Sequence, residues 1–199
     1  RQGVNEVGTR ARYTYLRDPA EIYRSSFERI RNEADLTGLP RDIAEIAVRL
    51  IHACGMTDLI DSLAYAPGVA SAALGALKSG CSVIVDSRMT GEGVIRNLLP
   101  SSNAVLCRID DPRTTARAGA ESTTRSAAAI DLLVDDLGGA VVAIGNAPTA
   151  LFRLLEVIGE GAPRPAVILG FPVGFVGAAE SKEALIAADN GVPYLTVRG

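Results

Sequence analysis

The chain is poor in metal-binding and nucleophilic side chains. It has one histidine, His52, and three cysteines, Cys54, Cys81 and Cys107, in 199 residues. Transition-metal sites need several such ligands, so we expect no bound metal. The cysteines form no C-x-x-C pair and lie inside predicted helices or strands, which is typical of buried free thiols in a reducing cytoplasm. The G-x-S-x-G elbow of many serine hydrolases is also missing.

Tryptophan is absent, and aromatic residues make up only 5% of the chain. Lysine is nearly absent too, with two lysines against eighteen arginines. A compositional bias of the genome would explain this ratio. A ligand rich in carboxylates would also explain it, because the guanidinium group binds carboxylates through two hydrogen bonds. The net charge of −3 argues against nucleic acid as a partner.

Long hydrophobic runs and a secretory signal pattern are missing as well, so we expect neither a membrane partner nor export. The length fits one domain with a full core. We therefore predict a single domain over residues 1–199, of which 1–12 are expected to be flexible.

His52 lies in the most clearly amphipathic stretch of the chain, residues 41–55. At about 100° per residue, Ile43, Ala47, Leu50, Ile51 and Cys54 share one face, as expected of a helix. His52 falls on the opposite face beside Glu45 and Arg49, and Gly55 supplies the helix stop.

The last helical turn favours a protonated imidazole, whereas the nearby charge of Arg49 opposes it. A histidine under both influences is suited to exchange a proton near neutral pH. By position alone, His52 is more readily explained as an ordinary surface residue near a helix end.

The remaining pattern alternates short apolar strands with helices. A further helix is predicted from the cap at Asp18 to about Ala34. The predicted strands are 82–85, 104–109, 140–144, 166–169 and 194–197. The predicted helices between or before them are 67–78, 91–97, 115–137, 147–158 and 178–189. Continuously apolar strands between helices predict an α/β fold, a three-layer α/β/α sandwich with a mainly parallel five-stranded sheet behind N-terminal helices.

Ligands of such sheets bind where strands end and loops begin. The loops after the predicted strands are polar or rich in glycine and proline, as expected of a site. One of them, Gly170-x-x-x-Gly174-x-x-Gly177, has the setting of a nucleotide-binding turn but not the G-x-G-x-x-G spacing, and it lacks a Walker lysine. We therefore interpret its glycines as packing residues, with a nucleotide-dependent enzyme as a minor alternative.

Several ordered motifs together resemble the precorrin-8X methylmutase family, also called cobalt-precorrin-8 methylmutases, of cobalamin biosynthesis. The resemblance covers the chain from about Tyr15 to Gly199. Its strongest segments are Ile22–Phe27, Ala47–Gly55, Asp111–Thr114, Thr124–Ala128, Ala143–Leu151 and Gly170–Lys182. The stretch from Asp86 to Met89 keeps the family's aspartate and methionine but contains an arginine. Family members usually continue past the position of Gly199, so a further C-terminal element is expected.

The resemblance implies a homodimeric isomerase that uses no cofactor. It would move a methyl group from carbon 11 to carbon 12 of the corrin ring, giving hydrogenobyrinic acid or its cobalt counterpart. The histidine at position 52 would be the catalytic acid, and Ser26 and Arg49 would contact substrate. Such a sigmatropic shift needs no nucleophile or redox centre, and a ring made electron-poor by protonation would favour it.

The substrate carries many carboxylate arms, so we predict further binding residues in the loops. The full set of predicted substrate-binding residues is Ser26, Arg49, Asp86, Met89, Thr90, Arg113, Thr124, Arg125 and Asn146. Arg113 could instead only hold its own loop together. Arg125, predicted in mid-helix among alanines, is favoured as a ligand contact. Asn146 is more readily explained as a helix cap. The alternative for the whole protein is a tetrapyrrole carrier without catalysis.

Overall fold

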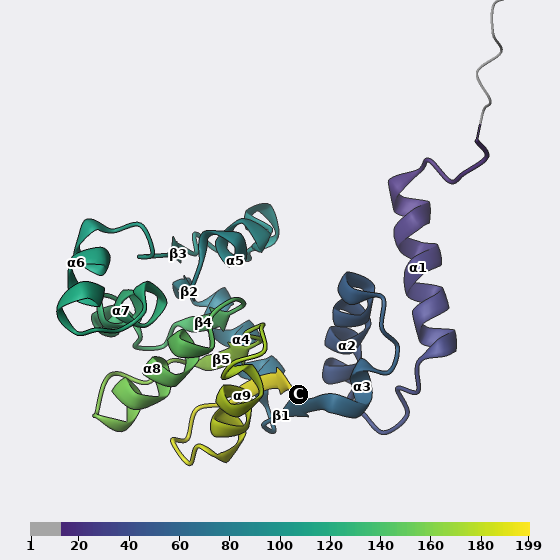
Figure 1. The fold of residues 1–199 in the computed structure, drawn as a ribbon. Coiled ribbons are helices and arrows are strands. Elements are labelled where there is room, and N and C mark those ends of the chain that lie inside the picture. Colours follow the sequence, from purple (N-terminus) through teal and green to yellow (C-terminus); the bar gives the residue numbers. More distant parts are fainter. Residues whose placement is uncertain (1–12) are drawn as a thin grey trace, which may run out of the picture. The chain divides into compact units, whose positions relative to one another are not determined.

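The computed structural model describes residues 13–199, so the predicted flexibility of residues 1–12 lies outside the described residues. The chain divides into two compact units, one up to Thr57 and the other from Asp58 to Gly199. Each unit is described by itself below (Figure 1).

The first unit contains two helices, α1 (Pro19–Glu33) and α2 (Arg41–Cys54), both as predicted. The Asp18 carboxylate accepts a hydrogen bond from the Glu21 amide at 3.0 Å, which caps α1. Gly55 ends α2 in the left-handed conformation, with φ of 74°, which glycine adopts without strain.

A pair of charged side chains joins the two helices. Arg31 of α1 donates to both carboxylate oxygens of Glu45 in α2, each at 3.0 Å. Ile43, Ala47 and Ile51 of α2 are buried, as the amphipathic pattern predicts. Cys54, predicted on the same face, is exposed because the helix ends there, so the prediction of a buried thiol is wrong at this position.

The second unit is built on a six-stranded, mainly parallel sheet. The strands, in the order β1-β6-β5-β4-β2-β3, are β1 (Leu63–Tyr65), β6 (Tyr194–Val197), β5 (Val167–Gly170), β4 (Val141–Ile144), β2 (Val83–Val85) and β3 (Val105–Leu106). All neighbours pair in parallel except β1, which runs antiparallel to β6. The predicted sheet lacked β1, because its three half-buried residues carry no clear alternation.

Helices cover both faces of this sheet, as the predicted sandwich requires. They are α3 (Leu59–Ser62), α4 (Val69–Lys78), α5 (Arg88–Gly93), α6 (Pro112–Ala120), α7 (Arg125–Asp131), α8 (Pro148–Gly159) and α9 (Ala178–Ala187), with 3-10 turns at Arg96–Leu98 and Val134–Asp136. Helices α6 to α9 pack in sequence along one side of the sheet, and α4 and α5 contact its strands from the other side (Figure 1). The α/β class and the layers are confirmed.

Two predicted helices have different bounds. The stretch 115–137 is not one helix, because the chain turns at Ser122 (φ 51°). A new helix, α7, begins after Thr124, whose hydroxyl caps it by accepting a hydrogen bond from the amide of Ala127. Likewise, the predicted helix at 91–97 is replaced by α5, which starts earlier, and by a 3-10 turn. In both places the side-chain hydroxyl of a cap residue, Ser87 for α5 and Thr124 for α7, sets where the helix begins.

The sheet has a topological switch point between β2 and β4, where the chain changes the direction in which it adds strands to the sheet. From β2 the chain next adds β3 on one side, whereas from β4 it adds β5 and β6 on the other. The crevice at the carboxyl ends of strands at such a switch point is where open α/β sheets bind ligands. In this chain it lies between the loop after β2 and the loop after β4.

Candidate active site

His52 is held by a hydrogen bond from the neighbouring helix of the first unit. Its Nδ1 lies 2.8 Å from the hydroxyl oxygen of Ser26 in α1. When Nδ1 carries a proton, it donates to this hydroxyl, which leaves Nε2 as the ring nitrogen that can deliver or take a proton. The two residues predicted as catalytic acid and substrate contact are therefore direct neighbours.

Two aromatic rings complete the surroundings of His52. The ring centres of Tyr23 and Phe27 each lie 5.2 Å from that of His52, and Phe27 meets the imidazole edge to face. Neither residue was predicted as part of the site. The available signal was their spacing, because positions 23, 26 and 27 share one face of a helix.

Arg49 lies on the same side of α2 as His52. It donates to the backbone carbonyl of Glu45 at 2.8 Å, and its guanidinium carbon lies 5.6 Å from the centre of the Phe27 ring. The Glu45 carboxylate is already paired with Arg31, whose hydrogen bonds hold the pKa of Glu45 below its usual range. Arg49 is largely exposed, so its remaining N–H groups are accessible to a ligand.

A surface pocket of about 240 Å³ opens beside His52. It is lined by Ser26, Arg29, Ile30, Glu33, Ile51, His52, Gly55 and Thr57. All of these residues belong to the first unit. The predicted catalytic histidine therefore faces a concave surface whose walls combine apolar groups, hydroxyls and charges.

In the second unit, Asp86 occupies the switch point between β2 and β4. Its side chain, 1% exposed, accepts hydrogen bonds from the backbone amides of Gly145, Asn146 and Ala147 at 3.0, 2.9 and 2.6 Å. The Thr90 hydroxyl donates to the same carboxylate at 3.0 Å. Asp86 was predicted to bind substrate, but its oxygens are engaged by the protein. Its role in the structure is to fix the loop after β4 against the loop after β2.

Thr90 and Met89, also predicted to contact substrate, differ in exposure. The Thr90 hydroxyl lies 2.9 Å from that of Ser87 and is committed to the Asp86 network. Met89 points its side chain outward and is 63% exposed. Of the two, Met89 is the residue whose side chain is accessible to a ligand.

Arg113 forms a closed pair with Asp111 at the start of α6. Its Nε and Nη2 donate to the two carboxylate oxygens at 3.0 and 2.7 Å. This hydrogen bonding lowers the pKa of Asp111 to about 2. The same carboxylate caps the helix by accepting the Arg113 amide at 3.0 Å. The geometry supports the interpretation that Arg113 holds its own loop together.

Thr124 and Arg125 stand at the beginning of α7, so the mid-helix placement of Arg125 is wrong. The Thr124 hydroxyl caps the helix and lies 2.8 Å from the hydroxyl of Thr149. Arg125 donates to the carbonyl of Ile109 and approaches Asp110 to 3.4 Å. Because Arg125 is the first helical residue, its side chain reaches the loop after β3 at the carboxyl edge of the sheet.

Asn146 does not cap the following helix, contrary to the prediction. Helix α8 has Ala147 at its cap position and no side-chain cap bond, because Pro148 at its start leaves one amide fewer to satisfy. The backbone amide of Asn146 donates to Asp86, and its carbonyl accepts from Val173 at 3.1 Å. These bonds tie the loops after β2, β4 and β5 together.

The glycine-rich loop after β5 exposes apolar side chains. Val173, Phe175 and Val176 are all exposed, Phe175 completely. Gly177 adopts a left-handed conformation (φ 79°) where a side chain would approach Pro148. This glycine serves a turn and a close packing contact, in agreement with the packing interpretation.

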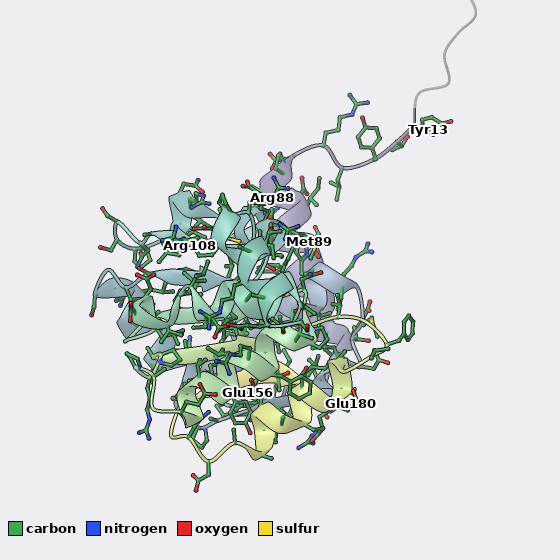
Figure 2. All side chains as sticks on the ribbon, turned by 60° about the vertical axis from the view of Figure 1, so that its left-hand side comes forward. Tyr13, Arg88, Met89, Arg108, Glu156 and Glu180 are labelled. Atoms are coloured by element: carbon green, nitrogen blue, oxygen red, sulfur yellow. The ribbon has the colours of Figure 1, made fainter. Side chains whose placement is uncertain are left out.

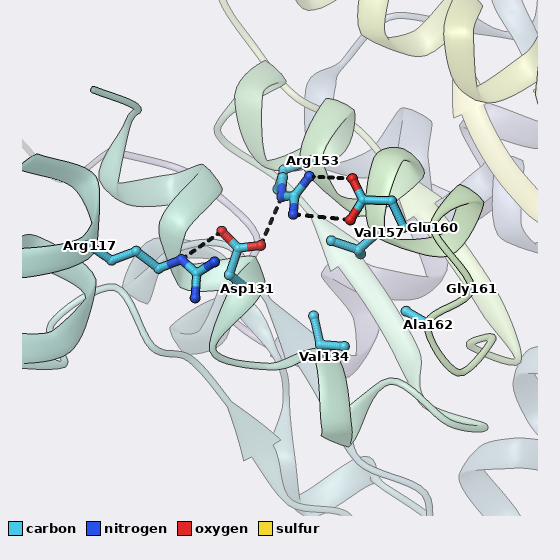
Figure 3. A pocket seen from close by; sticks show the side chains of 8 residues that line it. All are labelled: Arg117, Asp131, Val134, Arg153, Val157, Glu160, Gly161 and Ala162. Carbon is cyan, nitrogen blue, oxygen red and sulfur yellow. Dashed lines mark hydrogen bonds and ion pairs between the residues drawn. The ribbon is translucent and has the colours of Figure 1, made fainter. Parts of the chain in front are cut away.

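A pocket of about 430 Å³ in the second unit lies among α6, α7 and α8 (Figure 3). Its charged side chains pair with one another. Asp131 is bound by Arg153 at 2.8 Å and by Arg117 at 3.2 Å, and Arg153 also donates to Glu160 at 3.0 Å. The hydrogen bond to Glu160 is the largest cause of the raised pKa of Arg153. We interpret this network as a structural one that holds α6, α7 and α8 together.

Among residues 13–199, no group of three or more histidine, cysteine or acidic side chains is placed to hold a metal ion. In the same part of the chain, none of the helices has the length and apolar character needed to cross a membrane.

The comparisons with known proteins agree with one another. A model of the precorrin-8X methylmutase family matches residues 21–199. A precorrin-8X methylmutase from Pseudomonas aeruginosa is 54% identical over 93% of this chain and 89% of its own length. The chain belongs to the precorrin-8X methylmutase family. Membership confirms the prediction of an isomerase of cobalamin biosynthesis.

Other members of the methylmutase family show the same relationship. A precorrin-8X methylmutase from a Sinorhizobium species is 51% identical over 94% of this chain and 89% of its own length. A cobalt-precorrin-8 methylmutase from Priestia megaterium is 34% identical over 89% of this chain and 79% of its own. The crystal structure of a precorrin-8X methyl mutase from Thermus thermophilus matches with a TM-score of 0.81 and 36% identity, covering 90% of this chain and 86% of that one.

Proposed function

We propose that this protein isomerises precorrin-8X by moving the methyl group on carbon 11 of the ring to carbon 12, with His52 as the proton donor. The bond between carbon 11 and the methyl group breaks and the bond to carbon 12 forms. The ring double bonds shift accordingly, so substrate and product are isomers. Metal-free precorrin-8X is favoured over its cobalt counterpart because the two relatives above 50% identity carry the former name.

The observation that carries the proposal is the contact between Ser26 and His52. The hydrogen bond at Nδ1 leaves Nε2 for transfer to a ring nitrogen. Protonation there draws electron density from the conjugated ring as the methyl group migrates, and the same imidazole takes the proton back afterwards. A positioned general acid of this kind contributes roughly 10²–10⁴-fold to a rate.

The carboxylate arms of the substrate require cationic partners. Arg49, on the same helix as His52, has an exposed guanidinium group that suits this role. Ser26 also supports His52, so its hydroxyl has a function besides the predicted substrate contact. Asp86, Thr90 and Asn146 act indirectly, by shaping the loops at the switch point.

We further propose a homodimer acting in the cytoplasm. The resemblance implies the dimer, and the exposed apolar loop with Val173, Phe175 and Val176 supports it, because contiguous exposed apolar groups mark interaction surfaces. The three cysteines, free in the structure, are compatible with a reducing compartment.

The experiment follows the visible absorption of precorrin-8X mixed with the protein. We expect a time-dependent change to the product spectrum with the wild type. His52→Ala should abolish this change while the protein still binds the tetrapyrrole. A wild-type rate in His52→Ala would contradict the proposal. An immediate spectral change that is equal in both proteins and then stays constant would instead support the alternative, a carrier that binds without catalysis.

A further inference from the structure

Three charged side chains meet at the carboxyl edge of the sheet in the second unit. Arg88 Nε lies 3.0 Å from Asp110 Oδ2, and Arg125 Nη2 lies 3.4 Å from Oδ1 of the same carboxylate. Arg125 is also fixed by its hydrogen bond to the carbonyl of Ile109. One carboxylate therefore holds two guanidinium groups close to each other.

This cluster of Arg88, Asp110 and Arg125 lies where sheets of this kind bind their ligands. Arg88 begins α5, two residues beyond buried Asp86 at the end of β2, and Asp110 follows β3. Both loops belong to the edge where open α/β sheets bind ligands, next to the switch point. Figure 2 shows Arg88 and Met89 at one end of the second unit, well apart from Glu156 and Glu180.

The charges of the cluster are unbalanced. Two guanidinium groups share one carboxylate, and the side chains of Arg88, Asp110 and Arg125 are 78%, 52% and 51% exposed. Exposed pairs of this kind contribute little to folding stability. Among residues 13–199, Asp110 is the one acid within ion-pair distance of Arg88. With Arg88 held through Nε, its two terminal nitrogens remain as donors for an anion.

We propose that Arg88, together with Arg125, binds a carboxylate arm of the tetrapyrrole, with Asp110 as the residue that positions both arginines. The inference rests on the proposed function and adds Arg88 to its binding residues. Met89, directly beside Arg88 and 63% exposed, offers an apolar contact to the ring that carries the arm. Cationic and apolar groups side by side match a ligand with a flat ring and acidic side arms.

The test compares Arg88→Gln, which removes the charge, with Arg88→Lys, which keeps the charge but loses the planar pair of donors. Arg164→Gln is the matched control, because Arg164 is exposed and precedes β5, at the opposite edge of the sheet. The probe is hydrogenobyrinic acid, and its dissociation constant is measured by absorption titration. The KM and kcat for precorrin-8X are measured with the same proteins.

We expect Arg88→Gln to weaken binding roughly five- to tenfold and to raise KM by a similar factor, as loss of one charge-assisted contact does. Arg88→Lys should lose about twofold, and Arg164→Gln should bind as the wild type does. The kcat should stay within about twofold in all three, because Arg88 does not touch the migrating group.

An unchanged dissociation constant in Arg88→Gln would overturn the inference, as would equal weakening in Arg164→Gln, which would indicate an effect of net charge alone. These outcomes leave the proposed function intact as long as the wild type converts precorrin-8X. If the wild type neither binds the probe nor converts the substrate, the proposed function fails and this inference falls with it.

Discussion

At the scale of single residues, the chemistry depends on one histidine whose two ring nitrogens have different environments. Ser26 engages Nδ1, and the rings of Tyr23 and Phe27 limit the motion of the imidazole. Because the chain contains no other histidine, every imidazole signal in a spectrum of the protein belongs to His52. A change in this imidazole signal when a neighbouring residue is substituted can therefore be assigned to His52.

We predict that Ser26→Ala lowers kcat about three- to tenfold, the value of one hydrogen bond that orients the acid, with a smaller change in KM. Steady-state kinetics on precorrin-8X measures both. Ser25→Ala, next in sequence, is the control and should behave as the wild type. A raised KM with unchanged kcat would mean that Ser26 only contacts substrate.

The sequence places His52 and Arg49 on the polar face of one helix, and the resemblance to the methylmutase family implies their roles as site residues. The spacing of Tyr23 and Phe27 indicates that they share a face of α1 with Ser26, but it does not predict their contacts with His52. They depend on the register between α1 and α2, which is set by packing and by the pair of Arg31 with Glu45. Periodicity describes one helix at a time and carries no information on this register.

At the scale of elements, the loops at the carboxyl ends of the strands are organised by buried Asp86. Its four hydrogen bonds come from groups 4 to 61 residues away in the sequence. The sequence predicts that these loops form a site, but it does not show which polar residues face the ligand. Asp86 and Thr90 turn inward because the backbone amides after β4 need an acceptor.

We predict that Asp86→Asn lowers the free energy of unfolding by about 2–4 kcal/mol, because one acceptor is lost and an amide group faces backbone donors. Denaturant unfolding measures the loss. Asp135→Asn, an exposed change of the same kind, should alter stability by less than about 0.5 kcal/mol. A similarly small loss in Asp86→Asn would show that the network does not stabilise the fold.

The cap of α6 gives a prediction about pH. The pKa of Asp111 falls from 3.8 to about 2 in the folded protein, chiefly through Arg113. The ionised carboxylate therefore stabilises the fold fully above the unfolded pKa, and this contribution is lost as the pH falls toward 2. The stability difference between the wild type and Asp111→Asn should be constant above about pH 5 and shrink below it. Melting temperatures across this range measure it, and a difference independent of pH would contradict the assignment.

The elements themselves were predicted unevenly, for physical reasons. Five of the six strands follow from apolar runs between helices, whereas the three residues of β1 are all half-buried and show no alternation. The helix expected over 115–137 is divided because the Thr124 hydroxyl caps the N-terminus of a second helix, α7. Helix propensity summed over many residues does not predict where one side-chain hydrogen bond to the backbone interrupts a helix.

At the scale of the whole molecule, the predicted homodimer has a direct test. Light scattering should give a mass near twice the 20.7 kDa of the chain. Replacement of the fully exposed Phe175 by aspartate should shift the mass toward that of one chain, because a charge would enter an apolar contact. A wild-type mass of one chain would contradict the dimer. The single domain predicted over residues 1–199 stays a prediction, which one cooperative unfolding transition would support.

The measurement that tests the central claim most directly uses precorrin-8X with ¹³C in the methyl group on carbon 11. After incubation with the protein, the account predicts that the labelled methyl resonance moves to the position of a methyl group on carbon 12, with no label lost to solvent. With His52→Ala the resonance should stay where it was. A label that remains on carbon 11 with the wild-type protein, or migrates equally fast with His52→Ala, would contradict the account.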